Sequence, residues 1–285
     1  MKIFRHWHMA RLSDDGREVD GSRSNEGLAG ALGWSNESPA AAHDHALQRA
    51  RRFFETICGE RDDLLHSRYS YDDRPVREPI LDEIDHAGER VAAITRNGYG
   101  ATVLNAASLF IADVDLDRGA PTMIGRLFGK QSPERQALER ITATLAGRPS
   151  RVYRTAAGLR IFVVDRPIDP ASDEALALLE ALGSDPLYRR LCEHQQCYRA
   201  RLTPKPWRLE LPDPPKVLRN PSIDARKDAD AQQGVDRYER ASADHAVCER
   251  VDVPSVAGSD DVFDEAATVM RRHDSAVLQS GKPLA

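Results

Sequence analysis

The sequence predicts an α+β protein with an antiparallel or mixed sheet and helices packed on that sheet. Segments with strand and helix patterns follow one another irregularly along the 285 residues, without the strict βαβ alternation of a doubly wound fold. Apolar residues recur at helical spacing after Pro39, whereas strict two-residue alternation marks LFIADVDLD, residues 109–117. A chain of this length can bury a core without disulfides or structural metals.

We expect an N-terminal strand over residues 1–12, a flexible segment over 13–38, and a single α+β domain over 39–285 with its motif core at about 91–210. A helix opens at Pro39 and runs to about residue 65, and residues 79–87 suggest a short helix. Further strands are expected at 91–95, 102–106, 108–116, 151–155, 159–165, 198–202 and 245–253, and further helices at 133–146, 169–183, 185–196, 224–242 and 261–278.

The composition of the chain bears on the ligands it could bind and on the compartment in which we expect it. The net charge is −5, so any site for a polyanion must come from local clustering of cations. The four cysteines are scattered, which favours reduced thiols over a disulfide framework or a zinc ribbon. Because no apolar run approaches ~18 residues and the N-terminal residues lack a signal-peptide core, we expect a soluble cytoplasmic protein with no membrane partner.

The acidic strand end is the first candidate site. On an extended chain Asp113, Asp115 and Asp117 lie on one face, and the alternating apolar residues lie on the other. Carboxylates two residues apart on a strand are ~6–7 Å apart, close enough to converge on a divalent cation. On this hypothesis, replacing Asp113 and Asp115 with Ala leaves the fold intact. The alternative is a solvated strand end without chemistry.

A local excess of cations follows the acids. It comprises Arg148, Arg151, Arg154, Arg160, Arg199, Arg201, Lys205 and Arg208. Arginine binds phosphate oxygens bidentately and lysine adds a point charge, so the cluster is typical of a phosphate site. The alternative is that these arginines pair with acids on neighbouring helices. The small Thr-Ala-Ala-Gly turn at 155–158 would let a ligand approach the backbone, and Tyr153, Tyr198 and Trp207 are aromatic residues near the cations.

Four histidines form two close pairs near the N-terminus. His6 and His8 share one face of the first strand and could bind a metal, although surface or hydrogen-bonded histidines explain them as well. His43 and His45 do not share a helical face, which argues against a metal site between them.

The stretch FIADVDLD, followed after one helix by YRTAAGLRIFVV, resembles the first two motifs of the archaeo-eukaryotic primase superfamily, the primase-polymerases. The resemblance covers about residues 105–207 and implies an RRM-like catalytic core, Mg²⁺ or Mn²⁺ at Asp113 and Asp115, and a nucleoside triphosphate substrate. RARLTPKPW is similar to a downstream segment of some members. Arg160 stands where the family has a histidine, and the third acid has no clear match, with Asp117 or Asp165 as candidates.

These observations predict a metal-dependent nucleotidyltransferase that acts on nucleoside triphosphates and nucleic acid. Asp113, Asp115 and Arg160 would be catalytic, and Asp113, Asp115 and Asp117 would hold Mg²⁺ or Mn²⁺. The nucleotide or its phosphates would be bound by Arg154, Thr155, Arg160, Arg199, Arg201 and Lys205. One alternative is a non-catalytic nucleic-acid or nucleotide-binding module on the same fold. Another is a structural protein whose acids and arginines simply pair.

Overall fold

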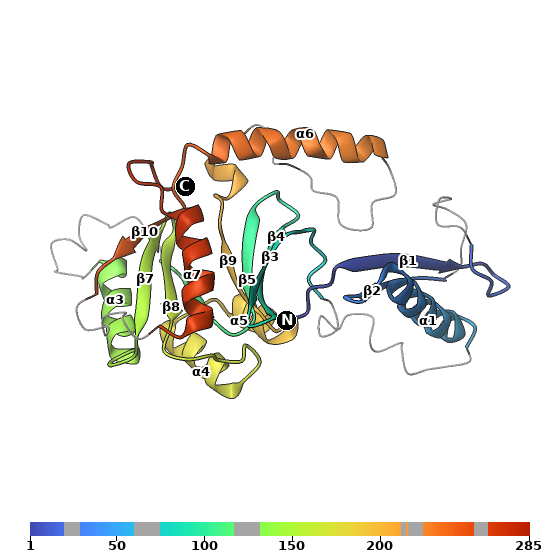
Figure 1. Ribbon diagram of the computed structural model, residues 1–285, viewed down its shortest axis with the longest axis horizontal. Helices are drawn as coiled ribbons and strands as arrows, with labels where there is room; N and C mark the ends of the chain where they lie inside the picture. Colours follow the sequence, from blue (N-terminus) through green and yellow to red (C-terminus); the bar gives the residue numbers. More distant parts are fainter. Residues whose placement is uncertain (20–28, 60–74, 117–131, 212–214, 216–224, 254–261) are drawn as a thin grey trace, which may run out of the picture. The chain divides into compact units, whose positions relative to one another are not determined.

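The computed structural model describes residues 1–19, 29–59, 75–116, 132–211, 215, 225–253 and 262–285. The chain forms two compact units (Figure 1). The small unit contains residues 2–79 and 217–233, and the large unit contains residues 80–216 and 234–285 together with Met1. This division differs from the single domain expected from residue 39, because the first helix packs on the N-terminal strands.

The small unit consists of a hairpin and one helix. Strands β1 (His6–Leu12) and β2 (Ala29–Ser35) pair antiparallel, and α1 (Pro39–Ile57) packs on them. Ser38 caps α1 by accepting a hydrogen bond from the Ala41 N–H at 3.1 Å, and Pro39 occupies its first position. Strand β2 lies within the segment that we expected to be flexible, so that expectation is wrong for 29–35. Its AGALGWS sequence has little strand propensity and is stabilised by its pairing with β1.

Gly33 explains how closely the helix approaches the hairpin. A Cβ atom at this position would lie 2.1 Å from the Ala46 nitrogen and 2.4 Å from the Ala42 oxygen. The absence of a side chain therefore lets the α1 backbone rest directly on β2. The buried alanines Ala46 and Ala50 then pack with Leu12 in a small core.

The large unit contains two four-stranded antiparallel sheets, in the orders β3-β4-β5-β9 and β10-β7-β8-β6. The α+β class and the antiparallel sheets are thus confirmed. The strands are β3 (Ile80–His86), β4 (Glu89–Arg96), β5 (Thr102–Ala106), β6 (Phe110–Asp115), β7 (Ser150–Thr155), β8 (Gly158–Val163), β9 (Tyr198–Arg201) and β10 (Cys248–Val251).

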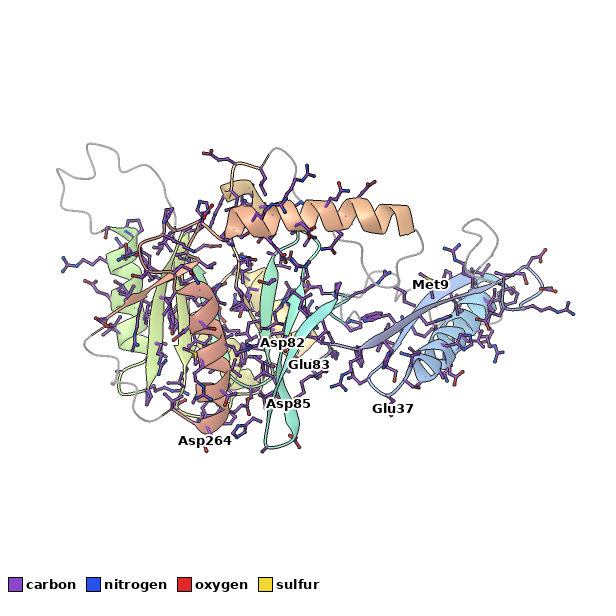
Figure 2. The ribbon with its side chains drawn as sticks, turned by 45° about the horizontal axis from the view of Figure 1, so that its top comes forward. Met9, Glu37, Asp82, Glu83, Asp85 and Asp264 are labelled. Atoms are coloured by element: carbon purple, nitrogen blue, oxygen red, sulfur yellow. The ribbon has the colours of Figure 1, made fainter. Side chains whose placement is uncertain are left out.

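Strand β3 corrects the short helix expected at 79–87. Ala87 and Gly88 both have positive φ, 51° and 85°, and form the two-residue turn that joins β3 to β4. The acidic residues Asp82, Glu83 and Asp85 are carried by this strand (Figure 2). Because acidic residues have low strand propensity, the sequence pattern did not indicate a strand here.

Helices cover both faces of the second sheet. The α-helices that follow α1 among the described residues are α3 (Pro133–Thr144), α4 (Asp173–Leu182), α5 (Pro186–Gln195), α6 (Ala225–Ser242) and α7 (Asp264–Val277). Of these, α6 pairs through Glu239 with Arg96 of β4, which belongs to the other sheet. The α7 residue His273 packs on Phe162 and Tyr153, whereas α3 pairs through Glu134 with Arg154 on the opposite face. Every described helix is too short or too polar to cross a membrane.

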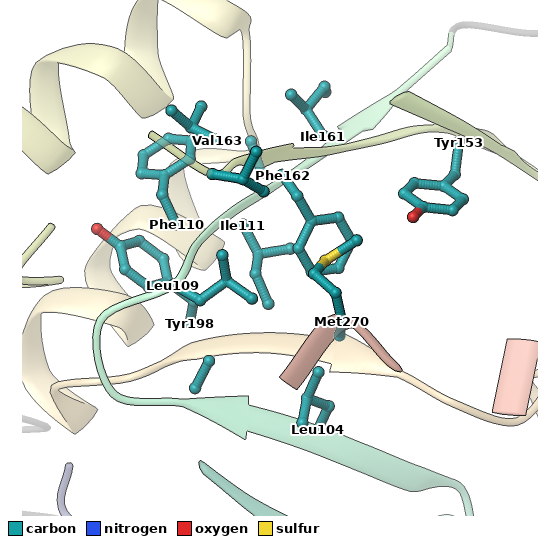
Figure 3. Packing of buried hydrophobic residues seen from close by; sticks show 14 of the residues in the cluster. Leu104, Leu109, Phe110, Ile111, Tyr153, Ile161, Phe162, Val163, Tyr198 and Met270 are labelled. Atoms are coloured by element: carbon teal, nitrogen blue, oxygen red, sulfur yellow. The ribbon is translucent and has the colours of Figure 1, made fainter. Parts of the chain in front are cut away.

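Buried residues of both sheets form one core (Figure 3). Phe110 of β6 packs on Tyr198 of β9 with ring centroids 5.1 Å apart, and Tyr153 packs edge-on against Phe162 at 5.6 Å. Leu104, from the other sheet, belongs to the same cluster. This shared core brings the β6 edge of one sheet beside the β9 edge of the other.

The edges of β6 and β9 are joined by side chains instead of a backbone ladder. The Tyr188 hydroxyl of α5 donates to the Ile111 carbonyl at 2.9 Å and accepts from the Arg199 N–H at 3.2 Å. Arg160 of β8 donates through Nη1 to the Arg201 carbonyl at 2.8 Å. Polar groups therefore line the junction between the two sheets.

Candidate functional site

A cavity of about 350 Å³ lies in the large unit. It is lined by the end of β6, the β7–β8 turn, the start of α5 and the segment that follows β9. Of the residues predicted from the sequence, six line this cavity: Asp113, Asp115, Thr155, Arg160, Arg201 and Lys205. Arg208, from the wider cation cluster, lines it as well.

Asp113 is neutralised by Arg160. The two residues are cross-strand neighbours on β6 and β8, and Arg160 Nε donates to Asp113 Oδ1 at 2.8 Å while Nη2 lies 3.4 Å from Oδ2. Burial raises the pKa of Asp113, but Arg160 and Arg201 lower it, and the net pKa is below the ordinary value. The charge of Asp113, where we expected a divalent cation, is therefore already balanced by a guanidinium.

The Arg160 side chain is buried and is fixed by contacts with several neighbouring residues. Its side chain is 2% exposed, and Nη1 lies 3.4 Å from His273 Nε2 in addition to its bond to the Arg201 carbonyl. The other ring nitrogen of His273 lies 2.8 Å from Asp274 Oδ1, a pattern that suits a neutral imidazole with its proton on Nδ1. A ligand in the cavity would meet the Arg160–Asp113 pair as a preformed unit of no net charge.

Asp115 differs from Asp113. It is exposed at the end of β6, opposite Gly158 of β8. Among the described residues its carboxylate has no hydrogen-bond or ion-pair partner. Asp115 is thus a carboxylate at the cavity that no described residue engages and that is available to a cation.

Arg201 and Lys205 form the cationic wall of the cavity with Arg208. Burial lowers the pKa of Arg201, Asp113 raises it and Arg160 lowers it, and the net shift is downward. Burial also lowers the pKa of Lys205, and the neighbouring Arg201 and Arg208 lower it further. Within the described part of the chain, the Arg201 guanidinium makes no ion pair or side-chain hydrogen bond. A partly buried cation of this kind is suited to an anionic ligand.

Two predicted phosphate-binding residues do not line the cavity. Arg154 is paired with Leu159 in the ladder, so it points to the face opposite Arg160, where its Nε donates to Glu134 at 2.9 Å. Arg199 lies 3.3 Å from the Gln195 side chain. Arg154 therefore fits the alternative of ordinary charge pairing.

Of the two candidates for the third acid, Asp165 lies away from the cavity. Asp165 forms a bidentate pair with Arg148, with N–O distances of 2.8 and 3.2 Å, and does not line the cavity. Asp117 lies outside the described residues.

The β7–β8 turn was expected to make room for a ligand at its glycine. The structure gives Gly158 another neighbour, because a Cβ atom there would lie 1.9 Å from the Val114 carbonyl oxygen. The glycine is required by the close approach of β6. Thr155 lines the cavity, and its hydroxyl accepts the Gly158 N–H at 3.0 Å.

An aromatic pair lies next to the cationic wall. Tyr99, in the β4–β5 turn, and Trp207, in the 3₁₀ helix η3 (Pro206–Arg208), are 59% and 61% exposed, with ring centroids 5.9 Å apart. Lys205 Nζ lies 5.5 Å from the Trp207 ring centroid. Of the rings noted in the sequence, Tyr153 and Tyr198 are buried in the core, and Trp207 is exposed.

Sequence reasoning did not identify Tyr188, His273 or Asp185 as parts of this region. Tyr188 and Asp185 line the cavity from the first turn of α5, and His273 reaches Arg160 from α7. Tyr188 and Asp185 belong to α5 and His273 belongs to α7, and helical periodicity does not show which strand a helix covers. Comparison of the chain with protein-family models, curated proteins and solved structures finds no match.

Proposed function

We propose that the large unit binds a nucleoside triphosphate, with its phosphates in the cavity against Arg201, Lys205 and Arg208. The observation that carries this proposal is the Arg201 guanidinium, which is partly buried beside two other cations without an ion-pair partner among the described residues. Arg201 and Arg208 both lower the pKa of Lys205, so these charges repel. A polyphosphate would relieve that repulsion and supply the missing acceptors.

The donor set supports one divalent cation. Asp115 offers a carboxylate that no described residue engages, whereas both Asp113 oxygens already face Arg160. Mg²⁺ is commonly held by one or two carboxylates together with substrate phosphates, so Asp115 would hold Mg²⁺ or Mn²⁺ that enters with the triphosphate. When bound, such a metal would neutralise phosphate charge.

The Arg160–Asp113 pair favours a module that binds the nucleotide without catalysis, and this is the function that we propose first. Two-metal phosphoryl chemistry uses carboxylates that can coordinate both ions. Here one of the two acids is occupied by a guanidinium that is itself fixed by Arg201 and His273.

Nucleotidyl transfer along a nucleic acid is the second candidate. The observation that favours it is the exposed Tyr99–Trp207 pair beside Lys205. Bases of a single strand stack on exposed aromatic rings while their phosphates follow neighbouring cations. A strand on this surface would have its phosphates near the cavity.

Thermal melting with three ligands tests the first proposal. We expect ATP with Mg²⁺ and inorganic tripolyphosphate each to raise the melting temperature by roughly 5–10 °C at about 100 times their dissociation constants. Adenosine, which lacks phosphates, is expected to do far less, and Lys205→Gln should reduce the phosphate-dependent shift. Equal shifts with adenosine and ATP, or no shift with any phosphate compound, would rule the proposal out.

Primer extension tests the second candidate. The assay contains Mn²⁺, a labelled primer–template and all nucleoside triphosphates. If the protein is a nucleotidyltransferase, it should extend the primer, Asp115→Asn should abolish this extension, and Trp207→Ala should weaken it. ATP binding without incorporation would leave the non-catalytic form as the function.

A further inference from the structure

Three potential metal ligands converge in the small unit, outside the cavity described above. They are His8 of β1, Glu18 from the segment after β1, and His43 of α1, and their ligand atoms all lie within 4.8 Å of one another. His43 Nε2 and Glu18 Oε1 are 2.8 Å apart, and the rings of His8 and His43 have centroids 4.6 Å apart. The side chains of His43 and Glu18 are about one-third exposed, so an ion could reach them.

The fold brings these residues together in two steps. His8 is the cross-strand partner of Gly33, the glycine on which α1 rests, so the helix brings His43 close to His8. Glu18 is returned beside β1 by a bridge to Leu12 and by the hydrogen bond from the Val19 N–H to the Arg11 carbonyl at 3.0 Å. The three ligands thus come from three separate segments.

The geometry resembles that of a protein zinc site before the metal enters. Zinc holds histidine nitrogens and carboxylate oxygens at ~2.0–2.2 Å, which places tetrahedral ligand atoms ~3.3–3.5 Å apart. Because the ligand atoms all lie within 4.8 Å of one another, their separations would have to change by at most about 1.5 Å to reach this arrangement. Two imidazoles and one carboxylate also leave a fourth position for water, as in catalytic zinc sites.

An independent observation concerns the other nitrogen of His43. While Nε2 faces the cluster, Nδ1 lies 3.5 Å from Asp44 Oδ1. Metal-bound histidines usually direct their second ring nitrogen to a carboxylate or carbonyl, which orients the ring and makes it a stronger ligand. His43 therefore has a candidate for this outer contact, on the same helix.

We propose that His8, Glu18 and His43 bind Zn²⁺, with Asp44 as the positioning residue for His43. Zinc is favoured over magnesium because two of the three ligands are imidazoles. The site lies on the small unit and does not depend on the proposed nucleotide cavity.

Titration of tag-free, metal-free full-length protein tests the site. We expect Zn²⁺ to bind with one-to-one stoichiometry and Co²⁺ to develop the visible absorption of a four-coordinate ion, whereas Mg²⁺ should produce neither signal. His8→Asn, Glu18→Gln and His43→Gln should each weaken Zn²⁺ binding at least about tenfold, since even the loss of outer contacts costs roughly 10- to 100-fold. Far-UV circular dichroism should show that the variants remain folded.

His6→Asn is the matched control. His6 lies two residues from His8 on the same strand face but outside the cluster. Zinc affinity close to that of the unmodified chain in this variant, with loss in the other three, would support the site. Equal loss in His6→Asn, or retained affinity in His8→Asn and His43→Gln, would overturn it. If a histidine variant unfolds, the Co²⁺ absorption spectrum of Glu18→Gln is measured instead. That spectrum must lose intensity if the Glu18 carboxylate is a ligand.

Discussion

At the scale of single residues, the Asp113–Arg160 pair changes the meaning of the acidic motif. The alternation of LFIADVDLD correctly placed Asp113 and Asp115 on one face, because both belong to the regular strand β6, in which alternate residues share a face. It did not show that Arg160 would be the cross-strand partner of Asp113. The two acids therefore have different roles, one structural and one available to a ligand.

This difference predicts opposite responses to substitution. Asp113→Ala would leave the buried Arg160 guanidinium without its counter-ion, and we expect a loss of about 3 kcal/mol in the free energy of unfolding. Asp115→Ala removes an exposed side chain without a described partner and should change that free energy by less than about 0.5 kcal/mol. Urea denaturation of both variants measures this. Similar values for the two would contradict the structural role of Asp113, and the earlier expectation that both acids are dispensable for folding would stand.

His273 predicts how stability depends on pH. Its ring is fully buried, and burial lowers its pKa from the ordinary value of about 6.5. Because the unfolded chain then binds the proton more readily, the contribution of His273 to stability is complete above pH 6.5 and is lost as the pH falls below that value. The pKa values of Asp113 and Asp274 are also lowered, and these groups act only at more acidic pH.

Melting temperatures at pH 8 and pH 5.5 test this prediction. The unmodified chain should melt lower at pH 5.5, and His273→Gln should show a smaller difference between the two pH values, even if it is less stable at both. The pKa of His43 is raised by its hydrogen bond to Glu18, so His43 changes the stability with pH in the opposite direction. Because His43 is present in both chains, its contribution cancels when their pH differences are compared. An unchanged pH difference in His273→Gln would show that this ring does not titrate in the expected range.

At the scale of elements, the sequence located most helices because their ends carry clear signals. Ser132 and Ser172 cap α3 and α4, and Asp185 with Pro186 starts α5. The two missed strands, β2 and β3, lacked such signals. Glycine and alanine in β2 and acids in β3 obscure strand propensity, and both strands are stabilised by antiparallel pairing with a neighbour.

The packing of α1 on β2 predicts contrasting effects for two glycines of the same strand. In Gly33→Ala the new Cβ would meet the Ala46 backbone at 2.1 Å, so the helix must move away, at a cost of about 1–3 kcal/mol or more. In Gly30→Ala the nearest atoms are at 3.5 Å, an ordinary contact, and stability should be nearly unchanged. Thermal melting of the two variants checks this. Equal melting temperatures would contradict the close approach of α1.

At the scale of the whole molecule, the sequence identified part of the site because strand alternation assigns faces. Of the nine proposed phosphate, metal or catalytic residues, eight are described, and six of these line one cavity, although they come from three separate segments. Arg154 and Arg199 do not, because a local pattern does not show which acid or amide lies opposite. The zinc candidate was missed for the same reason, since its histidines belong to two different pairs in the sequence.

The dissociation constant for inorganic tripolyphosphate tests the central claim most directly. Arg201→Gln removes the cation on the cavity wall, and Arg199→Gln removes the same charge two residues earlier on β9, outside the cavity. Calorimetric titration should show binding weakened about 10- to 100-fold in Arg201→Gln, the value of one or two charge-assisted hydrogen bonds, and nearly unchanged in Arg199→Gln. Equal weakening in both variants, or an unchanged dissociation constant in Arg201→Gln, would contradict a phosphate site in this cavity.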